Sequence, residues 1–151
     1  MKNKTFLFFA AVMFLFTVDS CQHHYPVSLV EADSLAYSNP KAALQKLDSL
    51  SLCLDTTQKA DVMYLRLLKM TAKDKLYMSF GTLDSVQSLA KYYEEEGDKH
   101  LLPRAYYMLG RRLCDMHDVP QAFTYYRKAL DLLDENYDIH LRGFLYLSLI
   151  H

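Results

Sequence analysis

The chain has 151 residues, enough for one small domain, and 51% of them are hydrophobic while 23% are charged, which excludes an intrinsically disordered polypeptide. The formal net charge is −1 at pH 7, so no overall positive field points to nucleic acid as a partner. Gly and Pro number only four each, and this scarcity of helix breakers favours helices over a β-sheet.

The first twenty residues have the pattern of a secretory signal peptide. Two lysines precede an apolar run of about 14 residues at 5–18, and the small residue Ser20 ends the segment. The run is shorter than the roughly 20 apolar residues that a membrane-spanning helix needs. We therefore expect residues 1–20 to be cleaved and to contribute nothing to the fold.

A cysteine, Cys21, directly follows this segment, and the arrangement resembles the lipobox of bacterial lipoproteins. In that family the signal peptidase cuts before a cysteine, which then carries lipid. Ser20 matches the small residue before the cysteine, Val18 is accepted at the third position back, and Asp19 is atypical. The resemblance implies that Cys21 is lipidated and that residues 21–27 tether a folded domain to a membrane. The alternative is an ordinary signal peptide with a cysteine there by chance.

Apolar residues recur at helical spacing along residues 28–151. The pattern predicts helices at 28–37, 41–50, 58–76, 82–96 and 141–150, and two more within 103–136. Asn39-Pro40 marks the start of the second helix, and Gly97 is expected to end the fourth as a glycine that follows a helix C-terminus. The predicted fold class is therefore all-α.

The stretch 103–136 carries the most specific pattern. Its two apolar stripes are Tyr106, Leu109, Gly110 and Leu113, and then Ala122, Tyr126, Ala129 and Leu133. Between them, Asp118-Val119-Pro120 supplies an N-cap and a proline in the first turn of the next helix. Each stripe must be covered by the other helix, which predicts an antiparallel hairpin in which the small residues permit close approach.

These thirty-four residues match the length and pattern of one tetratricopeptide repeat, W-x2-L-G-x2-Y followed by A-x3-F and P. The positions that carry the match are Tyr106, Leu109, Gly110, Leu113, Ala122 and Tyr126. Asp134 stands where the final Pro is usual. The resemblance implies that residues 28–151 form helical hairpins stacked as a right-handed α-solenoid, incomplete at the C-terminus. A helical hairpin of an unrelated bundle is the alternative.

In tetratricopeptide arrays the first helix of each pair lines a concave groove that holds partner proteins. By that resemblance, and with Tyr64 aligned to Tyr106, the groove residues here are Lys69, Lys73, Arg104, Tyr107, Arg111 and Asp115. Together they would form a basic strip beside a tyrosine, suited to an acidic peptide or a C-terminal carboxylate. The alternative is that these side chains are ordinary solvated charges.

No catalytic or metal-binding pattern accompanies this groove. The sequence has no G-x-S-x-G, no glycine-rich phosphate loop, no H-E-x-x-H and no C-x-x-C. We therefore expect no enzyme activity, no cofactor and no metal. The spacing of Cys53 and Cys114 does not demand a disulfide, and both are expected as thiols at least half-buried among apolar residues.

The last predicted helix, 141–150, carries a single charge and no polar face. A repeat array normally ends in a helix with a polar outer side, so this surface is expected to be bare and apolar. Either the chain is the front piece of a longer array, or this surface is buried by self-association or by another partner.

The sequence thus predicts a lipid-anchored scaffold of the bacterial cell envelope, facing the periplasm, that binds a protein or peptide and no nucleic acid. The alternative is an N-terminal sensory fragment of a longer regulatory protein without its output domain, because similar lipobox-bearing repeat proteins can continue into a membrane helix and a DNA-binding domain. A third interpretation, a nutrient-binding envelope lipoprotein, requires a ligand pocket.

Overall fold

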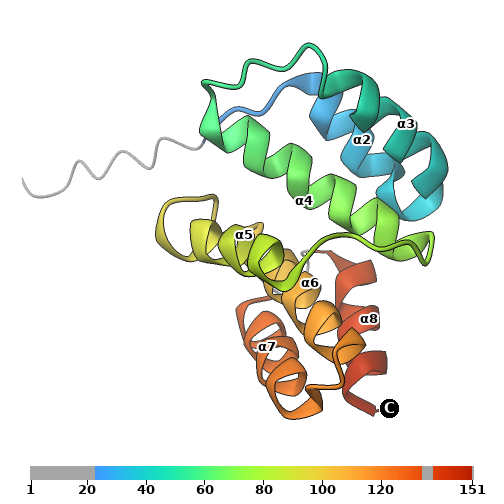
Figure 1. The fold of residues 1–151 in the computed structure, drawn as a ribbon, viewed down its shortest axis with the longest axis vertical. Coiled ribbons are helices and arrows are strands. Elements are labelled where there is room, and N and C mark those ends of the chain that lie inside the picture. Colours follow the sequence, from blue (N-terminus) through green and yellow to red (C-terminus); the bar gives the residue numbers. More distant parts are fainter. Residues whose placement is uncertain (1–22, 134–137, 151) are drawn as a thin grey trace, which may run out of the picture.

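The computed structural model describes residues 23–133 and 138–150, and within these ranges the secondary structure is seven α-helices with no strand. In chain order the helices are α2 (Val27–Ser38), α3 (Pro40–Leu50), α4 (Lys59–Lys75), α5 (Leu83–Glu95), α6 (Leu102–Asp115), α7 (Val119–Leu132) and α8 (Ile139–Ile150) (Figure 1). The predicted all-α class is confirmed. The predicted signal peptide, Cys21 and residues 134–137 lie outside the described residues.

The helix boundaries follow from local chemistry, and the predicted ranges with defined ends agree with them to within two residues. Four helices begin with a side chain that accepts a hydrogen bond from a backbone N–H of the first turn. These N-caps are Asn39 before α3, Thr82 before α5, Asp118 before α7 and Asp138 before α8. Prolines occupy the first turns of α3, α6 and α7, where their missing N–H has no helical partner to lose.

Most helices pack against the helix that follows them in the chain, and α2 also packs against α4. α2 packs against α3 and α4, α6 packs against α5 and most extensively against α7, and α8 lies against α7 (Figure 1). The direct contact between α4 and α5 is small. Since the short α2–α3 and α6–α7 connections place consecutive helices side by side, the hairpin predicted within 103–136 is present as α6 and α7.

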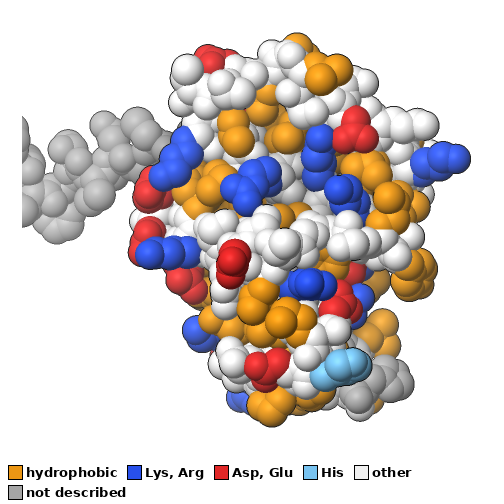
Figure 2. Space-filling model, in the orientation of Figure 1, with side chains coloured by type: hydrophobic (Ala, Val, Ile, Leu, Met, Phe, Trp, Pro, Cys, Tyr) orange, Lys and Arg blue, Asp and Glu red, His pale blue; other side chains and the backbone are white. Residues whose placement is uncertain are grey.

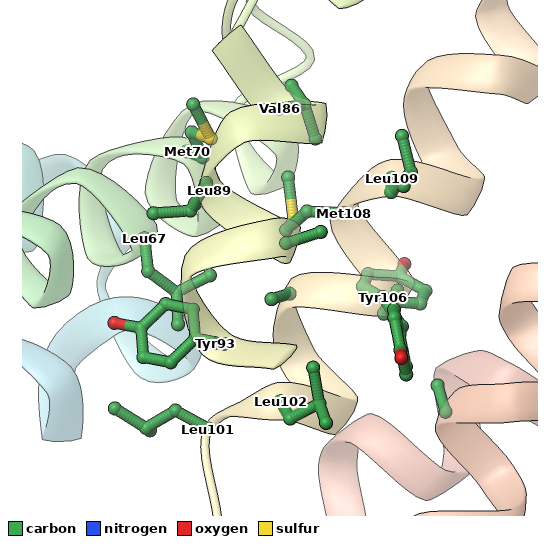
Figure 3. Packing of buried hydrophobic residues seen from close by; sticks show 14 of the residues in the cluster. Leu67, Met70, Val86, Leu89, Tyr93, Leu101, Leu102, Tyr106, Met108 and Leu109 are labelled. Carbon is green, nitrogen blue, oxygen red and sulfur yellow. The ribbon is translucent and has the colours of Figure 1, made fainter. Parts of the chain in front are cut away.

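Helix α6 lies at the centre of the core. Ten consecutive residues, 101–110, are buried, because α5 and α7 cover different sides of the helix. The sequence predicted a single buried stripe here, and the additional burial reflects tertiary packing that periodicity does not report. Figure 3 shows Leu67 from α4, Leu89 from α5 and Met108 from α6 in the same packed region. Each is fully buried and contributes roughly 1.5–3 kcal/mol through removal of its surface from water.

The segment before α2 is docked on the body. The ring nitrogen Nε2 of His23 lies 2.6 Å from Oδ1 of Asp61 at the start of α4. The rings of Tyr25 and Tyr64 lie 4.3 Å apart between centroids. The described part of the predicted 21–27 tether, residues 23–26, therefore packs against α4, and the helix begins at Val27.

Helices α4 and α6 end in the same way. Tyr77 and His117 both have positive φ, 56° and 62°, a left-handed conformation that usually falls to glycine. The next N–H reaches back into the helix in both cases, from Met78 to the Lys73 carbonyl at 2.9 Å and from Asp118 to the Leu113 carbonyl at 3.0 Å. These matched ends lie 40 residues apart, from Tyr77 to His117, whereas the alignment of Tyr64 with Tyr106 spaces the two helices by 42 residues.

Two glycines occupy positions where a side chain would clash with a neighbouring tyrosine ring. A Cβ on Gly110 would lie 2.5 Å from Cε1 of Tyr126, which confirms the predicted close approach of α6 and α7. Gly97 follows α5 as predicted, but Gly81 is the glycine with positive φ in the described chain. The predicted conformational role of Gly97 is therefore wrong. Its Cβ would instead lie 2.6 Å from Cδ1 of Tyr93, so packing is what excludes a side chain there.

We expect Gly110→Ala to destabilise the protein although alanine is the better helix former. The methyl group overpacks the contact with Tyr126, which costs about 1–3 kcal/mol. Gly143→Ala in α8 is the matched control, because a Cβ there meets no atom within 4 Å, and the helix gains up to about 1 kcal/mol. Urea unfolding measures both variants. Equal upward shifts of the two midpoints would contradict the close packing of α6 on α7.

Candidate functional site

A buried arginine on α6 joins three separate segments of the chain. The side chain of Arg104 is 8% exposed. Its Nη1 donates to Oδ1 of Asp33 on α2 at 2.5 Å, and its Nη2 donates to Oδ2 of Asp138 at 3.1 Å, immediately before α8. One guanidinium therefore fixes α2, α6 and the start of α8 relative to one another.

Both carboxylates of this ion cluster have further hydrogen-bond donors. Tyr64 Oη on α4 donates to Oδ2 of Asp33 at 2.6 Å, and Tyr37 Oη donates to Oδ2 of Asp138 at 3.2 Å. The backbone N–H of Leu141 donates to Oδ1 of Asp138 at 2.8 Å, so this carboxylate also caps the first turn of α8. A buried charge is stable only when paired and hydrogen-bonded, and these contacts meet that condition.

The ionisation of the cluster follows from its burial. Burial lowers the pKa of Arg104, but Tyr37, Asp33 and Asp138 raise it, and the net shift is upward. Burial also raises the pKa of Tyr37, with Asp138 adding to the shift while Arg104 opposes it. Arg104 is therefore permanently charged and Tyr37 is a neutral donor at physiological pH.

A groove of about 550 Å³ lies over this cluster, between α2 and α8. It is lined by Val30, Asp33, Ser34, Tyr37, Ser38, Arg104, Asp138, His140 and Phe144. The Tyr37 ring stacks on His140 at 5.4 Å and on Phe144 at 5.8 Å between centroids. The groove thus has aromatic walls on two helices and an ion cluster within its lining.

Lys75, the last residue of α4, lies among the same aromatic rings. Its Nζ is 3.3 Å from the centroid of Phe144 and 5.4 Å from that of Tyr107, with Tyr37 at 5.9 Å. Burial lowers the pKa of Lys75, and Asp74, whose carboxylate is 3.5 Å away, opposes the shift. The rings hold this ammonium through cation–π attraction.

Four of the six predicted groove residues lie on α6, and the structure assigns them different surroundings. Arg104 and Tyr107 are buried, and Arg111 donates from Nε to Oδ1 of Asp74 at 3.0 Å. Asp115 is exposed at the end of the helix. Arg104 and Arg111 are therefore already neutralised by carboxylates of this chain, and the expectation of a free basic strip on α6 is corrected.

The other two predicted groove residues, Lys69 and Lys73, do not join this site. Lys69 pairs at 2.8 Å with Asp48 of α3. Lys75 is the α4 lysine that reaches α6 and α8, and Lys73 lies about 200° around the helix from it. Figure 2 shows Lys and Arg side chains over α4 interspersed with hydrophobic and acidic ones. Of the four basic residues predicted for the strip, Lys69, Arg104 and Arg111 are therefore paired with carboxylates of this chain.

Several residues of the groove were missed from the sequence. Asp33 and Tyr37 lie four residues apart and therefore on one face of α2, beside its apolar stripe. This spacing is the signal in the sequence that could have indicated a polar surface there. Asp138, His140 and Phe144 carry no comparable signal, because they are recognisable only by the residues that they meet in space.

Two further surfaces were predicted. On the outer face of α8, Tyr146, Leu147 and Ile150 are exposed, which confirms the bare apolar surface. Neither Cys53 nor Cys114 forms a disulfide; Cys114 is half-buried as expected, and Cys53 is exposed, so its predicted burial is wrong.

Within the described ranges, no cluster of three or more His, Cys, Asp or Glu could hold a metal ion. None of the helices in residues 23–133 and 138–150 has both the length and the apolar character for a bilayer crossing. Comparison with protein-family models, curated proteins and solved structures gives no significant match to this chain.

We expect Arg104→Met to reduce stability by about 3–5 kcal/mol, because the substitution leaves the carboxylates of Asp33 and Asp138 without their counter-ion. Lys69→Met is the control. Its partner Asp48 is 63% exposed, and exposed ion pairs contribute less than about 1 kcal/mol. Chemical unfolding of the two variants measures the difference, and equal midpoints would show that the cluster has no structural role.

Proposed function

We propose that this protein is a membrane-tethered scaffold of the bacterial cell envelope that binds a protein or peptide partner in the groove between α2 and α8. The observation that carries the proposal is the groove itself, with a volume of about 550 Å³ and the aromatic side chains of Tyr37, His140 and Phe144 in its lining. Concave sites with apolar or aromatic walls and a few fixed polar groups are typical of ligand recognition. Arg104 supports the site by holding both walls.

The proposal includes a tetratricopeptide-like arrangement, in which α2–α3, α4–α5 and α6–α7 are successive hairpins and α8 belongs to a further unit. It is supported by the repeated helix end at Tyr77 and His117 and by the close approach of α6 and α7 at Gly110. It is supported also by the shared position of α2, α6 and α8 around one groove. In such arrays the first helix of each pair forms the binding surface.

The anchor is the lipid predicted on Cys21. Residues 23–26 lie against α4, so only Gln22 separates the proposed lipid from the docked segment. A lipid at this position would hold the groove near a bilayer, facing the periplasm.

We expect Cys21→Ser to move the protein from the membrane fraction to the soluble fraction and to abolish incorporation of an alkyne-tagged fatty acid. Cys53→Ser is the matched control, since Cys53 is an exposed thiol in the folded domain and its loss leaves the lipobox intact. In-gel fluorescence after coupling of the tag measures both variants. Labelling that persists in Cys21→Ser and disappears in Cys53→Ser would overturn the anchor.

The groove itself is tested by photo-crosslinking in cells of the bacterium that carries the gene. p-Benzoylphenylalanine at Ser38, on the lining of the groove, is expected to give a discrete crosslinked product, whereas the same group at Ser49 on α3 gives none. Adding Ser34→Trp fills the groove and should reduce the Ser38 product about tenfold. A product that forms equally from Ser49, or that survives Ser34→Trp, would contradict a partner in this groove.

A further inference from the structure

The side chains that line the groove carry a net negative charge. Its lining contains two carboxylates, Asp33 and Asp138, against one guanidinium, Arg104. Arg104 is 8% exposed whereas the side chain of Asp33 is 21% exposed, so an entering group meets a carboxylate before it meets the arginine. Lys75 and Arg111 are not part of this lining and share one carboxylate, Asp74. The ammonium of Lys75 lies against two of the lining rings, those of Phe144 and Tyr37.

The groove also offers more hydrogen-bond acceptors than donors, because the hydroxyl groups that line it already donate within the protein. Ser34 donates to the Glu31 carbonyl at 2.7 Å, Ser38 donates to the Ser34 carbonyl at 3.2 Å, and Tyr37 donates to Asp138. Each of these hydroxyls keeps oxygen lone pairs that can accept. His140 is the exception, since its ring nitrogens donate or accept according to the tautomer.

The two carboxylates have acceptor capacity left as well. A carboxylate offers about four lone-pair positions. Asp33 accepts from Arg104 and Tyr64, and Asp138 accepts from Arg104, Tyr37 and the N–H of Leu141. The groove therefore presents mainly acceptors and calls for a ligand group rich in donors.

The aromatic side chains that line the groove lie next to cationic groups of this chain. Tyr37 and Phe144 are the rings that, with Tyr107, surround the ammonium of Lys75 at 3.3 to 5.9 Å from their centroids. Arg104 also lies over the Tyr37 ring, with Cζ 5.5 Å from the centroid. Rings in this part of the fold thus already hold two cationic groups, as expected from the negative face of an aromatic ring.

We infer that the groove between α2 and α8 takes a cationic side chain, the guanidinium or ammonium of an arginine or lysine on the partner, held by the unused acceptors of Asp33, Ser34 and Ser38. This inference rests on the proposed function of the groove and specifies the chemistry of its partner. It replaces the acidic partner that the sequence suggested, since the arginines that motivated an acidic peptide are paired within the chain.

A titration with three small probes of similar shape tests the inference on the full chain. Benzamidine, benzoate and benzyl alcohol each carry one benzene ring and differ in charge. In ¹H–¹⁵N spectra, benzamidine is expected to give saturable shifts at Ser34, Tyr37, Ser38, His140 and Phe144, with weaker shifts from benzyl alcohol and none from benzoate. Binding of benzoate at these residues as tight as that of benzamidine would overturn the inference.

A charge placed on the groove lining provides the matched variant. Ser38→Lys adds a positive charge beside the acceptors and is expected to weaken benzamidine binding about tenfold, through repulsion across a few ångströms of partly exposed surface. Ser49→Lys is the control. Both serines are exposed on a helix and donate to the carbonyl four residues earlier, but Ser49 lies on α3 away from the groove. Equal affinity in the two variants, with unchanged circular dichroism, would contradict a cation site.

The outcomes separate this inference from the proposed function. If benzoate binds the groove in preference to benzamidine, the inferred chemistry is wrong while the groove remains a binding site. If neither ion shifts the groove resonances, the inference is overturned, and the crosslinking from Ser38 decides independently whether a partner occupies the groove.

Discussion

The ion cluster around Arg104 links parts of the fold that are far apart in the chain. Its three charged members come from α2, α6 and the segment before α8, and they are separated by up to 105 positions in the chain, from Asp33 to Asp138. Together with the Tyr37 ring, which stacks on His140 and Phe144, the guanidinium holds the two walls of the groove next to each other. Asp138 serves two purposes, since it pairs with Arg104 and caps α8. The position of α8 and the shape of the groove are therefore coupled to one buried charge.

The helices themselves could be predicted because the information that defines them is local. Apolar periodicity sets the buried face of each helix, and N-caps such as Asn39 and Asp118 set the start within the same few residues. The contact of Gly110 with Tyr126 was also accessible, since both lie in the one hairpin with a specific pattern. The buried state of Arg104 was not accessible. An arginine on the first helix of a repeat looks solvent-facing until its two carboxylate partners are known, and they lie 71 and 34 residues away.

The alignment of Tyr64 with Tyr106 agrees with the burial of the two helices. It places Leu67 with Leu109 and Thr71 with Leu113, and these side chains are all buried. The helix starts are 43 residues apart and the helix ends 40 apart, because α4 has 17 residues and α6 has 14. What such an alignment cannot supply is the partner of each charged side chain. Lys69 pairs with Asp48, and Arg111 pairs with Asp74, which lies 37 residues away in the chain.

The polarity of the groove follows from the requirement that buried charges be compensated. Arg104 is too deeply buried to remain unpaired. Its Nη1 pairs with Asp33 and its Nη2 with Asp138, so the two terminal nitrogens of the guanidinium each have a carboxylate acceptor. Satisfying the arginine therefore places an excess of negative charge and of acceptor lone pairs at the surface above it. Arg104 suggests an anion site in the sequence, but in the fold its two carboxylate partners favour a cation. The negative groups cannot be removed to admit an acidic partner without cost, because the buried guanidinium would then lose its counter-ions.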